Sequence, residues 1–329
     1  RNVGGPYEPD PNGPLVTSQP KESNERADDD HLKPRYFNPD SVLQKSGHGS
    51  YVDLPNGETY LVHLTSRPFV PELRCTLGRE TAIQKMQRTS DGWLRMADGS
   101  NLAKIEAEEP NLPDVPMPEI PNFDDFDGGE LGNWYYSPRQ MPSTFANATE
   151  RPGWLRVRGE ESLASLNRTS LLTRKLTSVY ATVTTKMEFE PEVYQHSAGL
   201  TIYYDNMNNI FLRKYYSQTL GGSAISIVRL ENGEKTEMLD TRVAVEDKPI
   251  YFRLNIEGRR TWFEWGYDGE NWTKIGPDFD TTTFSDEYCK YGEFTGTMVG
   301  IAVTDAALHE KTADFDFFDY EADETKPVD

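Results

Sequence analysis

The sequence is poor in cysteine: Cys75 and Cys289 are the two such residues among 329. A small secreted scaffold held together by disulfides needs several pairs, so the sequence excludes that class of protein. One long-range bridge between the two cysteines is the alternative to a pair of buried thiols. We expect buried thiols, because an unpaired cysteine usually packs as a small apolar residue.

Long hydrophobic runs are missing as well. No segment approaches the roughly 20 consecutive apolar residues of a membrane-spanning helix, and the mean hydropathy is −0.71. The sequence therefore predicts a chain without a membrane partner. Three N-x-Ser/Thr sequons, at Asn147, Asn167 and Asn271, are close to what chance gives for this composition, so they do not decide whether the protein is secreted.

Positive charge is scarce, with 34 Lys and Arg against 54 Asp and Glu and a formal net charge of −20. A field of that sign repels phosphate backbones, so we expect no nucleic acid partner. The same field does not oppose binding of a neutral polysaccharide. Part of the acidic charge lies in the run at residues 28–30, which we expect to be a solvated surface loop.

Several common catalytic motifs are also lacking. The sequence has no phosphate-binding glycine loop, no H-E-x-x-H, no nucleophile elbow and no Cys/His set with metal-ligand spacing. Two carboxylate pairs are present, Asp125 with Asp127 and Asp314 with Asp316. Alternation along a strand places both members of a pair on one face. We expect these pairs to be solvated, with a role as calcium ligands as the alternative.

Short alternating runs dominate what is present. Residues 49–54 and 59–64 flank an Asn-Gly pair, which is a strong hairpin signal, and residues 81–86 and 93–96 flank a similar Asp-Gly turn. Strand, turn and strand repeated at this spacing is typical of the blades of a β-propeller. We therefore interpret residues 1–105 as propeller-like.

A proline-rich segment divides the chain. Five prolines lie between residues 106 and 122, and because proline fixes φ and lacks an N–H, we expect residues 106–121 to be an extended linker. After it, short alternating strands are separated by turns at the spacing of a β-sandwich. The sequence thus predicts an all-β protein whose second domain is a sandwich over residues 122–329.

Two residues stand out as candidates for a functional site. His48 lies between two glycines just before a strand, which lets another segment approach its imidazole. Arg79 precedes Glu80 at the start of another strand, where a guanidinium can reach carboxylates or sugar hydroxyls. The structural alternatives are a histidine bonded within a turn and an ion pair, with Glu80 binding a cation elsewhere in the protein.

These clusters, in order, resemble glycoside hydrolase family 43. The resemblance rests on residues 47–50 (GHGS), 60–68 (YLVHLTSRP) and 77–84 (LGRETAIQ), with GPYE at residues 5–8 before them. The second domain resembles the accessory domain of the same family at FDDF, residues 123–126. Near its end FTGTMVG (294–300) and ADFDFFDY (313–320) match as well.

The resemblance implies the last blades of a five-bladed β-propeller followed by a concanavalin-like β-sandwich. It implies an inverting exo-glycosidase in which a general base, a general acid and a third carboxylate act on arabinoxylan or xylo-oligosaccharides. All three carboxylates are expected upstream of this chain, so none is assigned here. Arg79 is implied to reach into the sugar pocket. His48 is implied to lie beneath it, beside a bound calcium or a water, and no other cofactor is required.

The chain opens at Arg1 without a methionine or a signal peptide, which we interpret as a processed or truncated product. Two blades leave sheet edges exposed and cannot close a propeller alone. We therefore expect the N-terminal half of the propeller, from the same precursor, as a partner chain that supplies the catalytic Asp, Asp and Glu. A substrate of this kind places the protein outside the cell.

Two alternatives remain open from the sequence. An α-L-arabinofuranosidase and a β-xylosidase are hard to separate, although the short stretch between Pro68 and Cys75 favours the former within the family. A carbohydrate-binding sandwich without catalysis is the other alternative, with Trp262, Trp265 and Trp272 as stacking platforms. The odd spacing of Trp262 and Trp265 places them on opposite faces, so we expect at least one of them to be buried.

Overall fold

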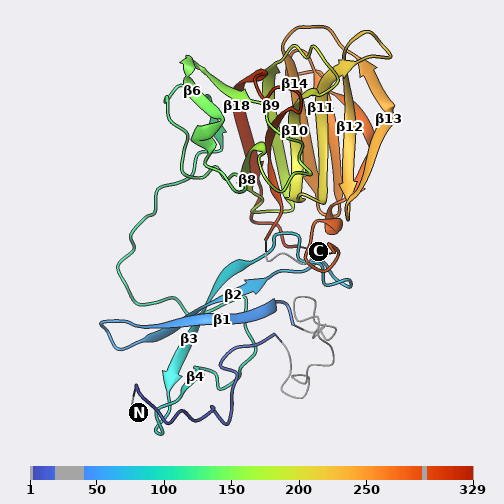
Figure 1. The fold of residues 1–329 in the computed structure, drawn as a ribbon. Helices are drawn as coiled ribbons and strands as arrows, with labels where there is room; N and C mark the ends of the chain where they lie inside the picture. The colour runs from blue at the N-terminus through green and yellow to red at the C-terminus, as the bar shows by residue number, and fades with distance from the viewer. Residues whose placement is uncertain (1–2, 19–40, 291–294, 329) are drawn as a thin grey trace.

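Strands make up almost the whole of the computed structural model, which describes residues 3–18, 41–290 and 295–328 (Figure 1). The acidic run at residues 28–30 and Phe294 lie outside these described residues. Within them, helix is limited to short 3-10 turns such as η2 (Pro142–Thr144) and η3 (Thr281–Thr283). No helix in the described ranges is long and apolar enough to span a membrane.

The N-terminal part forms one antiparallel sheet of four strands in the order β1-β2-β3-β4. Its strands are β1 (Gln44–Asp53), β2 (Thr59–Ser66), β3 (Glu80–Arg88) and β4 (Leu94–Met96). The hairpin predicted at Asn56-Gly57 is confirmed, because β1 pairs with β2 across that turn and Gly57 has φ +89°. The described part of the chain thus holds a single four-stranded blade, since the two hairpins join through β2 and β3 rather than forming separate blades.

One face of this sheet is covered and the other is partly open. The covered face packs its apolar side chains with residues from segments 3–18 and 97–104, which are joined by hydrogen bonds between Thr17 and Asn101 and between Ala103 and Thr17. On the other face Val62 lies opposite Ile83, and Val52 lies opposite Tyr60, which is buried beside the ion pair of Lys85 with Glu108. Val62, Ile83 and Val52 are 40%, 37% and 45% exposed, so they form a partly open apolar stripe.

Residues 105–122 carry no strand, and the second domain begins after them with β5 (Phe123–Asp124). It consists of two sheets packed face to face (Figure 1). The six-stranded sheet has the order β13 (Glu234–Ala244), β12 (Gly222–Glu231), β11 (Asn208–Ser217), β10 (His196–Asp205), β17 (Met298–Asp305) and β8 (Ser170–Lys175). The larger sheet has the order β16 (Thr273–Asp280), β15 (Arg260–Gly266), β14 (Ile250–Glu257), β9 (Tyr180–Glu188), β18 (Thr312–Ala322), β7 (Trp154–Arg158) and β6 (Ala146–Arg151), with β5 also pairing with β18.

Alternation builds the core between the two sheets. In β14, for example, Ile250, Phe252 and Leu254 are fully buried while the residues between them are half-buried. A β-bulge breaks the alternation in β18 between Phe315 and Phe317. Burial of this apolar surface is the main force that holds such a sandwich together.

The expectation that the carboxylates of β18 are both solvated is wrong for Asp314. Its carboxylate is buried and accepts hydrogen bonds of 2.8 and 2.9 Å from Arg156 and one of 2.9 Å from Arg151. Asp316 instead pairs with Lys186 at 2.7 Å. Both carboxylates lie on the outer face, because Ala313 and Phe315 on either side of Asp314 are in the core. Asp314 is buried there because the side chains of Arg151 and Arg156 cover it.

The blade joins the sandwich through the connection between β2 and β3, which lies at the lower end of the sandwich in Figure 1. Phe69 and Leu77 of this connection are buried in the same apolar cluster as the sandwich core. The carbonyl oxygen of Thr76 accepts two hydrogen bonds from Thr297, one of 3.1 Å from its amide nitrogen and one of 2.8 Å from its hydroxyl. The two parts therefore share one core rather than meeting only at the linker.

Gly78 lies in a close contact between the blade and the sandwich. Its φ is +71°, and a Cβ there would be 1.9 Å from the carbonyl oxygen of Thr295. We expect Gly78→Ala to destabilise the docked state by more than the roughly 1–2 kcal/mol that a left-handed non-glycine residue costs by itself. Thermal unfolding, with limited proteolysis of residues 106–121, measures the effect.

Gly57→Ala is the matched control, because Gly57 also has a positive φ and a Cβ there meets nothing within 4 Å. The control should lower stability only by the free energy of placing a non-glycine residue at a positive φ. Equal losses in the two variants would show that the close approach at Gly78 contributes nothing to docking.

Candidate functional site

His48 lies on β1, at the edge of the four-stranded sheet. It has φ +48°, and the pairing of β1 with β2 shifts on either side of it, between Gln44 and Gly47 and between Gly47 and Ser50. Its side chain is exposed. Gly49 is required for packing, because a Cβ there would be 2.9 Å from Cδ1 of Leu61 on β2. The local bulge thus turns the imidazole out of the sheet.

The calcium expected beside His48 has no ligand set in the described residues. No group of three or more His, Cys, Asp or Glu side chains there is arranged to hold a metal ion. Calcium prefers six to eight oxygen ligands, several of them carboxylates. His48 by itself provides one ligand, so a calcium beside it stays a prediction.

Arg79 immediately precedes β3 and lies against the sandwich. Its side chain is 12% exposed and forms an ion pair, through Nη1, with Oδ2 of Asp286, whose side chain is 1% exposed. Its carbonyl oxygen accepts a hydrogen bond of 2.8 Å from Nζ of Lys175. Burial lowers the pKa of the Arg79 guanidinium from its ordinary value, but arginine keeps its charge in proteins.

Asp286 is the centre of a buried polar cluster. Besides Arg79, its Oδ2 accepts from Nζ of Lys45 at 2.9 Å, and its Oδ1 accepts from the hydroxyl of Tyr204. Glu287 forms an ion pair with Lys45 and accepts a hydrogen bond of 3.0 Å from the amide of Cys75. Two cations of the blade therefore face two carboxylates of the sandwich, and burial raises the pKa of the Tyr204 hydroxyl.

This cluster brings the start of β1 and the start of β3 to one carboxylate. Lys45 is three residues before His48. The imidazole of His48 is exposed, however, and is not part of this buried cluster. Sequence reasoning missed both Lys45 and Asp286, because neither lies in a recognisable motif. The prediction that Arg79 reaches a sugar stays a prediction, while the structure adds that the sandwich holds this arginine.

The structural alternative for Glu80 is confirmed. Its carboxylate pairs with Arg67, with Nη2 and Oε1 2.8 Å apart. Both residues line a cleft of about 630 Å³ on the blade, together with Thr65, Ala82 and Lys104. A bidentate pair at this position fixes the segment that follows β2 to the first residue of β3.

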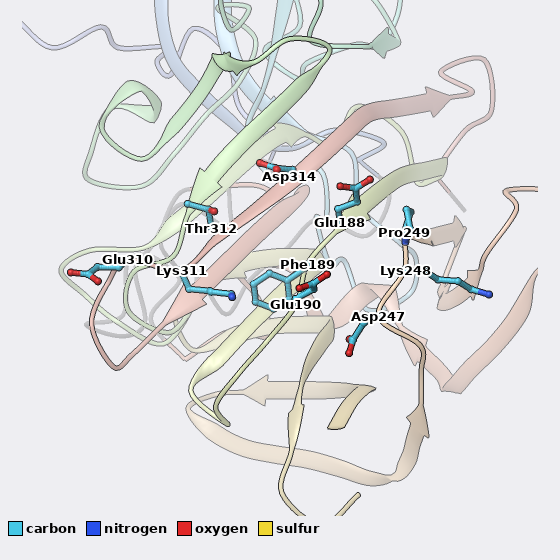
Figure 2. Close-up of a pocket in the computed structure, with 10 residues that line it drawn as sticks. All are labelled: Glu188, Phe189, Glu190, Asp247, Lys248, Pro249, Glu310, Lys311, Thr312 and Asp314. Carbon is cyan, nitrogen blue, oxygen red and sulfur yellow. The ribbon is translucent and has the colours of Figure 1, made fainter. Parts of the chain in front are cut away.

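Another cavity, of about 360 Å³, lies on the sandwich and is rich in charged side chains (Figure 2). It contains the end of β9 and the beginning of β18, including Glu188 and Asp314. β9 begins beside the blade and rises about 3.3 Å per residue, so its ninth residue lies at the far end of the sandwich. Lys311 at the cavity also pairs with Glu192 at 2.6 Å. Glu188 and Asp314 at the cavity are both paired with Arg151.

Trp262 and Trp265 lie on opposite faces of their sheet, as their odd spacing predicts. Trp265 packs against the core, whereas Trp262 lines a groove on the outer face of the larger sheet. The guanidinium of Arg260 lies 4.3 Å from the ring centroid of Trp262, and that of Arg253 lies 4.1 Å from the ring of Trp272. A guanidinium therefore lies over one face of each of these two rings.

Comparisons with known proteins agree with this architecture. Residues 1–94 match the family described as glycosyl hydrolases family 43, and residues 123–321 match the one described as beta xylosidase C-terminal concanavalin A-like domain. The crystal structure of xylan beta-1,4-xylosidase from Bacillus halodurans superposes with a TM-score of 0.87 at 39% identity, over 97% of this chain and 58% of that one.

Curated relatives give the same picture. The chain is 31% identical to a beta-xylosidase of Bacillus subtilis, over 97% of this chain and 58% of that protein. It is 28% identical to a non-reducing end alpha-L-arabinofuranosidase of Bacteroides ovatus, over 96% of this chain and 55% of that protein. The chain thus spans somewhat more than half the length of these relatives.

Cys75 and Cys289 are not bridged to each other, and both are fully buried, as expected from the sequence. Burial raises the pKa of the Cys75 thiol to about 12, so the reactive thiolate is absent at pH 8 in the folded state. We expect a thiol-specific chromogenic reagent to modify no cysteine in the native protein and two per chain after unfolding in denaturant. Rapid labelling of the native protein at pH 8 would contradict the buried positions.

Proposed function

The chain belongs to glycoside hydrolase family 43, and on this basis we propose that it is part of an inverting exo-glycosidase that releases pentose units. The proposed substrates are arabinoxylan and xylo-oligosaccharides. The observation that carries the proposal is the match over both domains to a xylan beta-1,4-xylosidase at 39% identity with a TM-score of 0.87.

Inversion needs a general acid and a general base that stand far enough apart to admit a water molecule. We propose that a separate polypeptide supplies these groups and a third carboxylate. It would correspond to the part of the relatives that this chain does not cover. The N-terminal propeller half is the proposed partner, and the partly open stripe of Val52, Val62 and Ile83 supports it. Such a stripe on a sheet face is the surface that a neighbouring blade buries.

Within this enzyme, the proposed role of Arg79 is to hydrogen-bond the sugar or to hold the acid and the third carboxylate. Its position supports this role, because a largely buried guanidinium keeps its charge in a region shielded from solvent. His48 on β1, which β2 separates from β3, is proposed to lie beneath the sugar, where its exposed imidazole can bind a water or a further ligand.

D-xylose is the pentose that we favour, with L-arabinofuranose as the second candidate. The relatives named as xylosidases are the more similar to this chain. The short connection after Pro68 had favoured an arabinofuranosidase, but its residues contact the sandwich. Phe69 is in the core, and the carbonyl oxygen of Val70 accepts from Arg259 at 2.5 Å. Its length therefore follows from domain packing and does not report on the sugar.

The proposal is tested by native mass spectrometry of the chain co-expressed with a polypeptide equivalent to the earlier blades. We expect a 1:1 complex that hydrolyses an aryl β-D-xyloside faster than an aryl α-L-arabinofuranoside. NMR of the first product should show inverted configuration at the anomeric carbon. A stable complex that hydrolyses neither substrate would refute the proposed activity.

Arg79→Lys tests the proposed sugar contact. Lysine keeps the charge beside Asp286 but loses the planar fork that binds two partners at once. We expect kcat/KM to fall roughly 10- to 100-fold, as for loss of a charge-assisted hydrogen bond. The control is Arg67→Lys, which alters the pair with Glu80. An equal loss in both variants would remove any special role from Arg79.

A further inference from the structure

The sandwich contacts Arg79 at both its backbone carbonyl and its guanidinium. Lys175 on β8 donates to its carbonyl oxygen at 2.8 Å, and Asp286 after η3 pairs with its guanidinium. Both contacts cross from the sandwich to the blade. An arginine on a flexible side chain would otherwise lose rotamer freedom each time it bound a sugar, and fixing it in the folded state removes that cost from the binding step.

Asp286 orients Arg79 and does not simply cancel its charge. Its carboxylate is shared by Arg79, Lys45 and Tyr204, so a second cation compensates part of its charge. Glu287 in turn pairs with Lys45. A buried carboxylate with several partners keeps a defined orientation, because each lone pair that lost its partner would carry a large desolvation cost.

The cluster also fixes the two blade strands that carry the candidate residues. Lys45 at the beginning of β1 and Arg79 before β3 contact the same oxygen of Asp286. The edge strand with His48 and the strand that follows Arg79 are therefore placed relative to each other by a side chain of the second domain. A small shift of the sandwich would move both.

We propose that Asp286 is a positioning residue for the sugar site and that the sandwich orients Arg79 for catalysis through it. This inference rests on the proposed function, in which Arg79 acts on the sugar or on the catalytic carboxylates. It goes further by giving the sandwich a defined part in the reaction. The second domain is then required for turnover and not only for stability or for attachment to the polymer.

The test uses the complex with the earlier blades and an aryl β-D-xyloside. Asp286→Asn keeps the size of the side chain and removes its charge, and we expect kcat to fall about 10- to 100-fold, the range for a misplaced catalytic group, with a smaller change in KM. Asp286→Glu should recover part of the loss. The effects of Asp286→Asn and Arg79→Lys on kcat/KM should not multiply in the double variant, because the two residues act as one unit.

Arg259→Gln is the matched control. Arg259 forms an interdomain ion pair of 2.9 Å with Glu72 that is more than one third exposed on both sides and does not contact Arg79. This variant should weaken docking and lower the melting temperature, yet leave kcat within about twofold. A fall in kcat equal to that of Asp286→Asn, or fully multiplicative double-variant effects, would overturn the inference.

Lys175→Met provides a second variant in case Asp286→Asn does not fold. It releases the carbonyl of Arg79 without leaving a buried carboxylate unpaired, and we expect a loss in kcat in the same direction. Unchanged kcat in a folded Lys175→Met complex would then refute the positioning role. An inactive parent complex is a different result, because it refutes the proposed function itself.

Discussion

The buried contact between Asp286 and the two cations Arg79 and Lys45 is the interaction on which the relation between the two domains depends. Apolar burial of Phe69 and Leu77 brings the blade and the sandwich together, but apolar packing is non-directional. Ion pairs with hydrogen-bonding geometry give the contact its orientation, and their desolvation makes any misaligned arrangement costly. Apolar burial therefore stabilises the interface, and the ion pairs set the relative orientation of the two domains.

The sandwich and the blade differ in how completely they bury their own surfaces. The sandwich closes two sheets over one core, whereas the blade covers one face with neighbouring segments and leaves Val52, Val62 and Ile83 partly open on the other. A sheet of this size needs a covered hydrophobic face to be stable, and here part of its apolar surface stays in water. Its attachment to the sandwich supports one end of it, and the partly open stripe shows where a further blade would pack.

Much of the fold could be predicted because it is encoded locally. The hairpin at Asn56-Gly57 follows from a turn that only a few residues adopt, and the opposite orientation of Trp262 and Trp265 follows from the two-residue period of a strand. The same period gives the correct face for Asp314 but not its burial, because Arg151 and Arg156, which cover it, come from a distant part of the chain. Periodicity within a strand predicts the face of a side chain and not what covers that face.

The sequence by itself determined the all-β class, the family and two candidate residues, since these depend on patterns within a few tens of residues. The tertiary structure alone decided the partners of Arg79. Asp286 lies 207 residues further along the chain, and nothing in its local sequence distinguishes it from other acidic surface residues. An ion pair depends on distance in space, and that distance is set by the packing of Leu77 and Gly78 against the sandwich. A contact of such separation requires closure of a long loop of chain, so no local pattern specifies it.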